Sequence, residues 1–507
     1  PQWFCSVDAF KEEACAACDD VRWVPGWGID RMKSMIRERN DWCISRQRKW
    51  GLPIPVFYCK DCGKPICTDE TIDAISKLFA AEGSNAWFAK EAEEILPEGF
   101  ACPHCGAKAG FTKETDTLDG WFDSGSSHFA AMKKDQGFWP ATMYLEGLDQ
   151  YRGWFQSALL TAVGAFGQGA PFKECVTHGW TVDGEGKAMH KSLGNGVDPA
   201  DVFNENGADI LRLWAASADY HADVRCSKEI FKQLSQNYLK FRNTCKFMLD
   251  NLVDFDPEKL TKPEDMPVLD RWLLTKLNEL IEKAEQSYCD YEFHIITHAV
   301  NDFCVNTLSS FYLDIVKDRL YCEGAESATR RSAQTALYLT LHTLSKLFAP
   351  ILAFTCDEIW LAMPHTGDDD ARNVVLNEMN KPFTAYALDS ETMARWEHII
   401  AVRTVVNGAL EEARAAKVIG KSLEADVHLT VPESDRFFAD ESPEALADIF
   451  IVSKVELAIG DALAVKVDNA AGTKCPRCWK HSLEANAEGL CPRCAEVVKH
   501  LHLTELL

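Results

Sequence analysis

Apolar side chains recur every three or four residues through the middle of the chain, the period of one buried face of an α-helix. Two stripes are Leu269, Leu273, Leu277, Leu280, Ile281 and Ala284, then Phe293, Ile296, Val300, Phe303, Thr307 and Phe311. A third runs from Leu337 to Phe348 and stops before Pro350. Stripes of this kind usually form the core of a helical bundle, which we expect over residues 226–390.

The pattern before the bundle mixes short strands and helices. Residues 175–182 are rich in β-favouring side chains and predict a buried strand, whereas a strand end at 143–147 turns through glycine into a helix over 153–163. A second apolar-faced helix is expected over 202–218. This alternation predicts an α/β domain over residues 1–225, in which ligands bind at the carboxyl ends of parallel strands.

Beyond the last periodic helix of the bundle region, the pattern predicts two smaller domains. Residues 364–389 lack periodicity and are expected to form a linker, followed by a helix over about 397–417. The alternating segments VHLTV and KVELAI then predict strands of a small α/β junction domain over 391–470. Residues 471–507 are rich in cysteine and predict a separate zinc finger. The expected fold class is therefore α/β plus all-α.

Composition narrows the class of protein. A chain of 507 residues that is 47% hydrophobic can bury several cores, and no apolar run approaches the roughly 18 residues that span a bilayer. The formal net charge of −24 argues against non-specific coating of nucleic acid, although local basic patches can still bind tRNA. The start, Pro1-Gln2-Trp3-Phe4, has no charged leader, so we expect no secretory signal and a polypeptide that continues something longer.

Eight of the twenty cysteines form four CxxC pairs that match two and two. One set is Cys59, Cys62, Cys102 and Cys105, and the other is Cys475, Cys478, Cys491 and Cys494. In a large leaderless chain this usage predicts two structural zinc sites and a reducing cytoplasm. For the first set, two unrelated reduced pairs remain an alternative, and Cys67 and His104 are nearby spare ligands. Cys15 and Cys18 lack a matching pair, so two small residues on a helix is the favoured interpretation.

Residues 174–199 combine a strand, a glycine turn and a basic loop in the way that polyphosphate sites require. The turn Asp183-Gly184-Glu185-Gly186 needs glycine, and residues 187–195 follow as a flexible loop. The run Ala188-Met189-His190-Lys191-Ser192 resembles the KMSKS loop of class I aminoacyl-tRNA synthetases. The resemblance implies that Lys191 neutralises charge on the departing pyrophosphate of ATP, with Met189 beside the nucleotide.

Further blocks carry the same resemblance, the first to isoleucyl and valyl enzymes alike and the second to isoleucyl enzymes. They are WCISRQ at 42–47, DTLDGWFDSG at 116–125 and YLEGLDQYRGWF at 144–155. Taken alone, the aspartates of the second block are more typical of turns and caps than of a general acid and base. The resemblance implies that Trp121 and Trp154 line the amino-acid pocket, and that His178 and Gly179 lie near the adenosine. It further implies that Glu146 and Gly147 contact the adenylate, Asp149 the ribose side and Gln150 the substrate amino group.

The remaining segments fit the same family. FYLDIVKDRLY and APILAFTCDEIW resemble its anticodon-binding domain, and KCPRCW followed by CPRC resembles the zinc finger at the carboxyl end of bacterial isoleucyl enzymes. Lys474, Arg477, Lys480, Arg493 and Lys499 make a basic island around that finger. The implied reaction is ATP-dependent activation of isoleucine, with magnesium, and transfer to tRNA(Ile). The implied protein is a cytoplasmic monomer with a Rossmann-type catalytic domain.

The chain also departs from the family pattern. Ala188 and His190 replace the first lysine and the first serine of the loop, and the 507 residues contain no HIGH-type motif and no editing insertion. We therefore expect this chain alone to be inactive, or nearly so, in isoleucine-dependent pyrophosphate exchange. Two alternatives stay open: a non-catalytic tRNA-binding fragment, and a valyl-tRNA synthetase, against which the terminal CPRC pairs argue.

Overall fold

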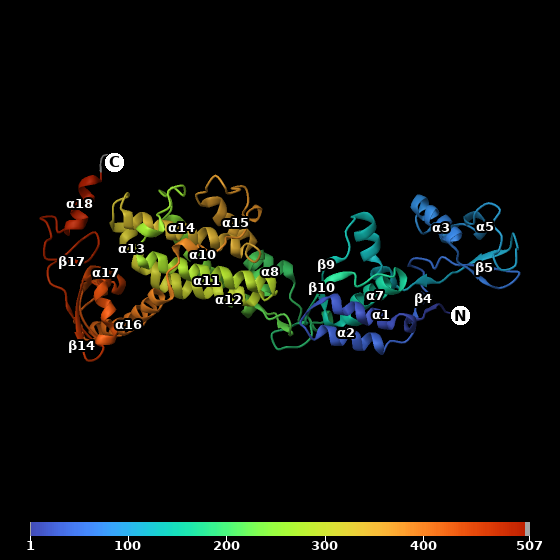
Figure 1. Cartoon of the computed structure of the whole chain (residues 1–507), viewed down its shortest axis with the longest axis horizontal. Helices are drawn as coiled ribbons and strands as arrows, with labels where there is room; N and C mark the ends of the chain where they lie inside the picture. Colours follow the sequence, from blue (N-terminus) through green and yellow to red (C-terminus); the bar gives the residue numbers. More distant parts are fainter. Residues whose placement is uncertain (1, 502–507) are drawn as a thin grey trace. The chain divides into compact units, whose positions relative to one another are not determined.

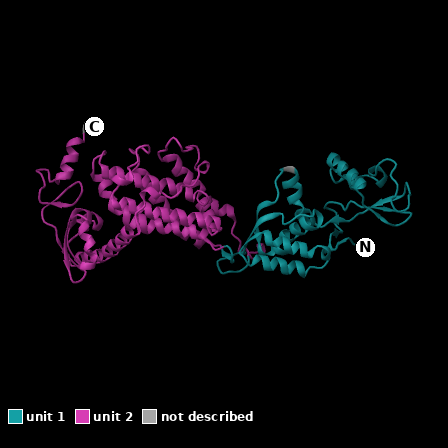
Figure 2. Cartoon of the chain, viewed as in Figure 1, with its two compact units in different colours: residues 1–188, 220–225 teal, residues 189–219, 226–507 magenta. Residues whose placement is uncertain are grey.

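The computed structural model describes residues 2–501 and divides into two compact units, shown in different colours in Figure 2. The first comprises Pro1–Ala188 and Tyr220–Arg225, and the second comprises Met189–Asp219 and Cys226–Leu507. Figure 1 gives the labels of the elements that follow. Each unit has its own hydrophobic core and is described by itself.

The first unit is built on a parallel sheet of three strands in the order β2 (Arg22–Val24), β10 (Phe172–His178) and β9 (Ala141–Gly147). The strand predicted over 175–182 is interrupted at Gly179 and resumes as β11 (Thr181–Val182), which pairs with β12 (Val224–Arg225). At the interruption the Gly179 N–H donates to the Tyr220 carbonyl at 2.9 Å, and this position must be glycine. A Cβ on Gly179 would lie 2.4 Å from the carbonyl oxygen of Ala222, so the backbone approaches too closely for any side chain.

Helices cover this sheet and bury its aromatic residues. α1 (Lys11–Ala17), α2 (Gly28–Arg37) and α7 (Trp154–Leu160) pack around a core that includes Trp23, Tyr151, Phe155 and Phe172. The helix predicted over 153–163 continues past α7 as a π-helical turn, η5 (Thr161–Ala165).

Cys15 and Cys18 belong to the same core. Burial raises the pKa of Cys18 to about 12, and its thiol donates to the carbonyl of Ala14 at 3.4 Å. No metal-binding group among residues 2–501 includes either thiol, so the structure places them as small core residues.

A small subdomain is inserted between β4 (Ser45–Arg46) and β8 (Thr117–Leu118). Its sheet is β6 (Pro65–Ile66), β5 (Phe57–Cys59) and β7 (Phe111–Lys113), flanked by α3 (Asp69–Glu82), α4 (Ala86–Ala89) and α5 (Ala92–Ile95). Phe57 and Trp87 are fully buried with ring centroids 5.1 Å apart. The sequence predicts short helices over 71–80 and 86–95: the first is α3, which is two residues longer at each end, and the second is divided into α4 and α5.

The second unit begins with two helices and continues as the helical bundle. A single helix was expected over 202–218, but α8 (Pro199–Asn206) and α9 (Ala208–Ser217) are separate because Gly207 adopts φ +87°, which ends the first helix. The bundle contains α10 (Lys228–Asp250), α11 (Val268–Cys289), α12 (Phe293–Asp302), η8 (Phe303–Tyr312), α13 (Leu313–Cys322), α14 (Ala328–Phe348) and α15 (Ala353–Ala362).

The apolar stripes seen in the sequence form the bundle core. Leu273, Leu277 and Leu337 are fully buried, whereas Thr307 is only half-buried, on a π-helical segment. A polar network lies within this core: the carboxylate of Asp270 accepts bonds from Tyr312 at 2.8 Å and Ser332 at 2.6 Å and pairs with Arg319 at 3.3 Å. A buried charge is tolerated only when it is paired and hydrogen-bonded in this way.

Residues 364–389, expected to form a linker, contain two short 3-10 turns, η9 (Val374–Leu376) and η10 (Thr384–Tyr386). α16 (Ser390–Ala415) begins seven residues before the predicted start, because Asp389 caps it by accepting from the Thr392 N–H at 2.8 Å and Trp396 is buried. β14 (Lys454–Gly460) and β15 (Ala464–Asn469) flank β13 (Ala425–Pro432), and α17 (Pro443–Phe450) makes the crossover between the parallel pair β13 and β14. The terminal cysteines lie between β16 (Thr473–Lys474) and β17 (His481–Ser482) and at the start of α18 (Pro492–His500).

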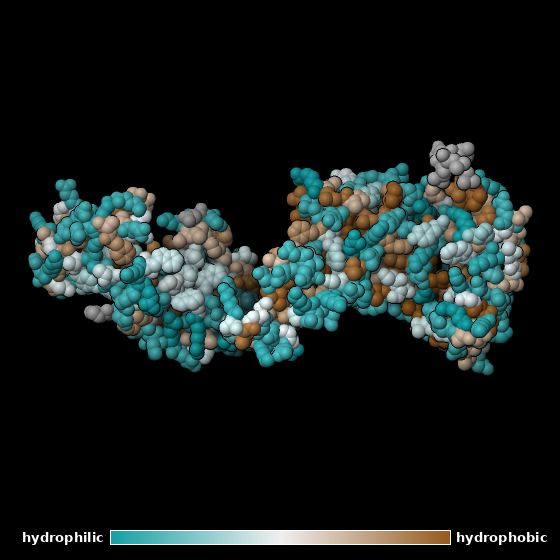
Figure 3. Space-filling view, turned by 180° about the vertical axis from the view of Figure 1, so that it is seen from behind, coloured by the Kyte–Doolittle hydropathy of each residue, from teal (hydrophilic) through white to brown (hydrophobic). Residues whose placement is uncertain are grey.

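The surface mixes polar and apolar side chains. Figure 3 shows hydrophilic residues over much of the face in view of each unit, with apolar patches on the bundle. Within residues 2–501, no helix is both long enough and apolar enough to cross a bilayer.

Candidate active site and metal centres

The predicted adenylate residues meet at the carboxyl edge of the parallel sheet. Gly147 at the end of β9 lies opposite His178 at the end of β10. A Cβ on Gly147 would lie 3.0 Å from Asp149 Oδ1 and 3.6 Å from His178 Cε1, so the glycine leaves the backbone open between these two polar groups. His178 is exposed, and its Nδ1 lies 2.8 Å from the carbonyl oxygen of Gly179. Carboxyl edges of parallel strands are the usual ligand sites of such sheets.

The turn between β9 and α7 is held by one amide side chain. Gln150 Oε1 accepts from the Trp154 backbone N–H at 2.9 Å, and Gln150 Nε2 donates to Asp149 Oδ2 at 3.1 Å. A Cβ on Gly153 would lie 2.3 Å from Gln150 Oε1 and 2.9 Å from Trp121 Cη2. The structure therefore brings Trp121, Asp149 and Gln150 together around Gly147 and Gly153.

Trp121 is positioned through Asp119 and two residues of the WCISRQ block. It lies on α6 (Gly120–Gly125) and is 45% exposed, so its ring is available to a ligand. Asp119 caps this helix and also accepts from Trp42 Nε1 at 2.9 Å and pairs with Arg46 at 3.0 Å. The WCISRQ block thus orients the helix that carries Trp121. The sequence indicated that Asp119 could cap a helix, but not that its carboxylate contacts Trp42 and Arg46.

The lysine loop is divided between the two units. Asp183 Oδ1 accepts from the N–H groups of Glu185 at 3.0 Å and Lys187 at 2.8 Å, and Gly186 closes the turn at φ +86°. Lys187 pairs with Glu185 at 2.8 Å. Beyond Ala188 the chain belongs to the second unit, where Met189 packs on the cluster of Val202, Ile210, Cys226 and Phe231. Lys191 is exposed and begins the short helix η6 (Lys191–Leu193).

The first cysteine set converges as predicted from its spacing. Cys59 Sγ lies 3.6 Å from Cys105 Sγ, and Cys62 Sγ lies 3.8 Å from Cys102 Sγ. Four sulfurs at about 2.3 Å from a tetrahedral zinc would be about 3.8 Å apart, so the four thiols fit that ion. Burial opposes ionisation of Cys102, but N–H donors of His104 and Cys105 outweigh it and lower its pKa to about 6. Cys67 and His104 are not part of the set.

The terminal cysteine set has the same geometry. Cys475, Cys478 and Cys494 are buried, and Cys478 Sγ lies 3.7 Å from Cys491 Sγ. Backbone N–H groups of Cys478 and Cys491 more than offset burial and lower the pKa of Cys475 to about 6. Both sets could hold zinc, and four protein sulfurs leave no position for a reacting water.

A third group of metal-ligand type lies on the junction sheet. Asp426, His428 and Glu456 project from β13 and β14, with His428 Nδ1 2.9 Å from Glu456. Lys454 Nζ already lies 3.4 Å from Asp426 and also pairs with Glu456. Because a lysine supplies the positive charge, this group is better explained as an ion-pair network than as a cation site.

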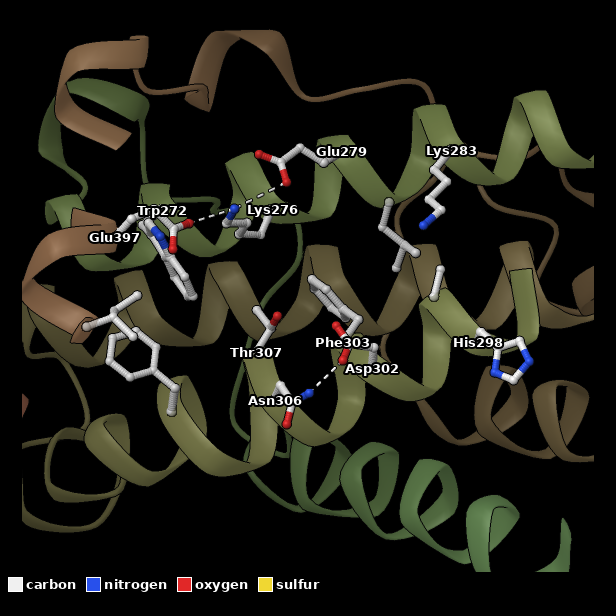
Figure 4. Close-up of a pocket in the computed structure, with 14 residues that line it drawn as sticks. Trp272, Lys276, Glu279, Lys283, His298, Asp302, Phe303, Asn306, Thr307 and Glu397 are labelled. Atoms are coloured by element: carbon white, nitrogen blue, oxygen red, sulfur yellow. Dashed lines mark hydrogen bonds and ion pairs between the residues drawn. The ribbon is translucent and has the colours of Figure 1, made fainter. Parts of the chain in front are cut away.

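The bundle contains a cleft of about 550 Å³ between α11, α12, η8 and α16 (Figure 4). Its apolar lining includes Phe303 and Phe311, and Lys276 at its rim pairs with Glu279 at 3.3 Å and Glu397 at 2.7 Å. Trp272 is 3% exposed, and its indole Nε1 is buried without a hydrogen-bond partner among the described residues. Periodicity identified Phe303 and Phe311 only as core and did not single out Trp272, so the cleft was not predicted.

Most of the chain matches two models of known protein families. Residues 1–227 match the model described as tRNA synthetases class I (I, L, M and V), and residues 270–429 match the anticodon-binding domain of tRNA ligase. A relative named isoleucine–tRNA ligase from Caldicellulosiruptor saccharolyticus is 50% identical over 98% of this chain and 55% of its own length. The isoleucine–tRNA ligase of Moorella thermoacetica is 49% identical over 99% of this chain and 56% of its own length. The chain thus spans about half the length of the curated relatives it matches.

Solved structures share the fold at low identity. Mycobacterium tuberculosis methionyl-tRNA synthetase bound by methionyl-adenylate aligns with a TM-score of 0.52 and 16% identity over 76% of this chain and 65% of that one. An Agrobacterium radiobacter LeuRS in a ternary complex with tRNA and LeuAMS aligns with a TM-score of 0.50 and 17% identity over 85% of this chain and 46% of that one. These likenesses concern the fold alone.

Proposed function

Because the chain belongs to the class I tRNA synthetases of the isoleucine, leucine, methionine and valine group, we propose that it forms the adenylate-binding and tRNA-binding part of an isoleucine–tRNA ligase. The observation that supports this most is the meeting of Gly147, Asp149, Gln150, Trp121 and His178 at one edge of the parallel sheet. The reaction joins the isoleucine carboxylate to the α-phosphate of ATP with release of pyrophosphate. The isoleucyl group then passes to the terminal ribose of tRNA(Ile).

The chemistry needs positioning and charge stabilisation rather than a protein nucleophile, because the substrate carboxylate is itself the attacking group. Gly147 offers an open backbone for the phosphate, and His178 and Gly179 at the end of the neighbouring strand would lie near the adenosine. Glu146 and Asp149 would accept from ribose or amino groups, and Gln150 Oε1 would face the substrate ammonium.

Trp121 and Trp154 would border the isoleucine side chain. A hydrophobic pocket separates isoleucine from valine, which is one methylene smaller, by only about 1–3 kcal/mol, a limit for which isoleucyl enzymes are themselves the standard example. Selection between the two amino acids at this site would therefore be modest.

Lys191 would supply the mobile positive charge toward the ATP phosphates, with magnesium neutralising the remainder when bound. Its exposure and its place in a glycine-rich loop support this role. The zinc ions that the two cysteine sets would hold are structural, since they stabilise the turns that carry the cysteines. Both sets require reduced thiols, which agrees with action in the cytoplasm. We expect a monomer.

The bundle would bind the anticodon end of tRNA(Ile). The cleft offers an aromatic lining, a buried indole N–H on Trp272 that has no acceptor among the described residues, and Lys283 at its rim. An unstacked base is recognised by aromatic stacking together with hydrogen bonds to its edges, whereas lysines contact phosphate. These features support insertion of a loop base into the cleft.

The test uses the purified 507-residue chain, a non-hydrolysable isoleucyl-adenylate analogue and tRNA(Ile). We expect saturable binding of both, preference for the isoleucyl over the valyl analogue, and pyrophosphate exchange near background because the chain has no HIGH-type motif. Lys191→Ala should weaken ATP-competitive binding, whereas Lys187→Ala, a matched lysine already paired with Glu185, should not. Robust exchange by the chain alone would refute the expected inactivity.

Two outcomes would favour the alternatives. Binding of tRNA(Ile) without any adenylate binding would identify a non-catalytic RNA-binding protein, which the departures Ala188 and His190 favour. Equal or tighter binding of the valyl analogue would favour a valyl enzyme. Trp272→Phe keeps a six-membered aromatic ring but removes the N–H together with part of the indole, so a loss of tRNA affinity at unchanged unfolding stability would assign the cleft to the RNA.

A further inference from the structure

The basic island around the terminal cysteines is paired within the chain. Lys474 contacts Glu424 at 3.1 Å, Lys499 contacts Glu496 at 2.8 Å, and Lys480 pairs with Asp448. The two arginines of the CPRC turns contact α13 of the bundle, as described below. These five cations are therefore largely occupied by internal partners, which leaves less of their charge for a phosphate backbone than the sequence suggested.

Arg493 forms a two-pronged ion pair with α13. Its Nη1 donates to Asp318 Oδ2 at 2.5 Å and its Nη2 donates to Asp318 Oδ1 at 2.8 Å. Both side chains are partly buried, with 35% and 21% exposure. A bidentate guanidinium–carboxylate pair fixes distance and direction together, which a lysine cannot do.

Arg477 contacts the same helix at its carboxyl end. Its Nη2 donates to the Tyr321 carbonyl at 3.3 Å, and its Nη1 donates to the Cys322 carbonyl. Carbonyls in the last turn of a helix have no partner within the helix, and a cation there also interacts favourably with the helix dipole. Arg477 Nη1 lies 3.7 Å from Cys494 Sγ as well, so one guanidinium touches both the helix end and a cysteine of the set.

Cys322 lies at this contact. It is 6% exposed and packs in one cluster with Cys475, Cys478, Cys494 and Leu490. Its Sγ is 3.7 Å from the carbonyl oxygen of Arg477. Access of a reagent to this thiol therefore requires the finger to move away from α13.

We propose that the terminal cysteine set is a metal-dependent latch: a bound metal fixes the two CPRC turns so that Arg477 and Arg493 hold the finger on α13. Each arginine directly precedes the second cysteine of its pair, Cys478 or Cys494. Coordination that fixes those cysteines also fixes the adjacent backbone from which the arginines extend. Without metal, the two turns lose the anchor they share, so the finger leaves α13.

This latch goes beyond catalysis and depends only on metal in the terminal set. The two CPRC arginines are positioning residues in it, and the partner surface is the segment Asp318–Cys322 of the same chain. Loss of the metal would thus expose Asp318, the carboxyl end of α13 and the Cys322 thiol.

The experiment measures alkylation of Cys322 by iodoacetamide, followed by peptide mass spectrometry, with metal content determined on the same samples. The intact chain loaded with zinc should protect Cys322, and chelation should raise its labelling rate about tenfold or more. A Cys59→Ser/Cys62→Ser chain isolates the terminal metal: its Cys322 should stay protected until the remaining zinc is removed. If it labels as fast as the chelated chain while still holding that zinc, the proposal is overturned.

Single substitutions separate the latch from simple unfolding. Arg493→Gln and Asp318→Asn should each raise the labelling rate of Cys322 several-fold while zinc is retained. The double variant should label no faster than either single variant, because both substitutions remove the same Arg493–Asp318 ion pair. Arg436→Gln is the matched control, since Arg436 is exposed and its ion pair is a local one with Glu433. Unchanged circular dichroism in the variants excludes general unfolding. Multiplicative effects in the double variant, or chelation that leaves Cys322 protected, would overturn the latch.

Discussion

Trp154 stacks on Tyr144 with ring centroids 4.0 Å apart and planes inclined by 13°. Tyr144 belongs to β9 and Trp154 to the first turn of α7, so the stack joins the strand before the candidate site to the helix after it. The intervening turn, which carries Glu146, Asp149 and Gln150, is therefore held at both ends. Trp154 Nε1 adds a bond to the Ser124 carbonyl at 3.1 Å, which ties the same ring to α6.

Trp154→Ala should destabilise the first unit by about 2–4 kcal/mol, because the substitution removes the stack and leaves a cavity. The measurement is urea denaturation of the chain followed by circular dichroism. Trp154→Phe is the control: it keeps an aromatic ring over Tyr144 and should cost about half as much. Equal stability of the alanine variant and the parent chain would show that the stack does not support the turn.

Gly179→Ala should cost about 1–3 kcal/mol, because its Cβ would lie 2.4 Å from a backbone oxygen that cannot rotate away. The same substitution at Gly169, where a Cβ would meet nothing within 4 Å and φ is not positive, should be close to neutral. Thermal unfolding of the two variants side by side compares the two sites. A Gly169→Ala variant as unstable as Gly179→Ala would mean that close approach is not the cause.

Stability should depend on pH through His128. Burial, aided by Lys133, lowers the pKa of this histidine from 6.5 to about 4. Its Nδ1 accepts from Trp139 Nε1 at 3.1 Å, which requires the neutral ring. As pH falls, the unfolded chain therefore protonates His128 at a higher pH than the folded chain does. The stability that the neutral His128 ring contributes is full above about pH 6.5 and is lost as pH falls toward 4.

The size of that effect can be isolated by substitution. His128→Asn retains an acceptor for Trp139 but does not titrate. The difference in unfolding free energy between parent and variant should therefore shrink between about pH 7 and pH 5, by up to about 1.4 kcal/mol per unit. A difference that stays constant with pH would indicate that His128 has an ordinary pKa.

Cysteine substitution should remove one metal without the other. Cys102→Ser should lower the zinc content by one ion per chain and open the subdomain that contains Phe57 and Trp87, since its small core relies on the metal. Cys15→Ser is the matched control, because that thiol lies in a different core and should leave the zinc content unchanged. Loss of both ions from the Cys102→Ser chain would contradict the assignment of two independent sites.

Local signals explain why much of this protein was predictable. The three- and four-residue apolar stripes, the CxxC spacings and the glycine turns act over a few residues, and each depends on periodicity, ligand geometry or backbone conformation that the residues themselves carry. For that reason the bundle, the two cysteine sets and the strand-to-helix turn at Gly147 were all identifiable along the chain.

Tertiary packing decided the rest. Whether position 179 can carry a side chain depends on Ala222, and whether Asp119 orients Trp121 depends on Trp42 and Arg46. Whether Arg493 meets RNA or Asp318 depends on a helix 175 residues away. Such partners are distant in sequence and are selected by how complete elements pack, so no local pattern encodes them. The chain by itself thus determined which residues can do chemistry, and the folded structure determined which of them meet.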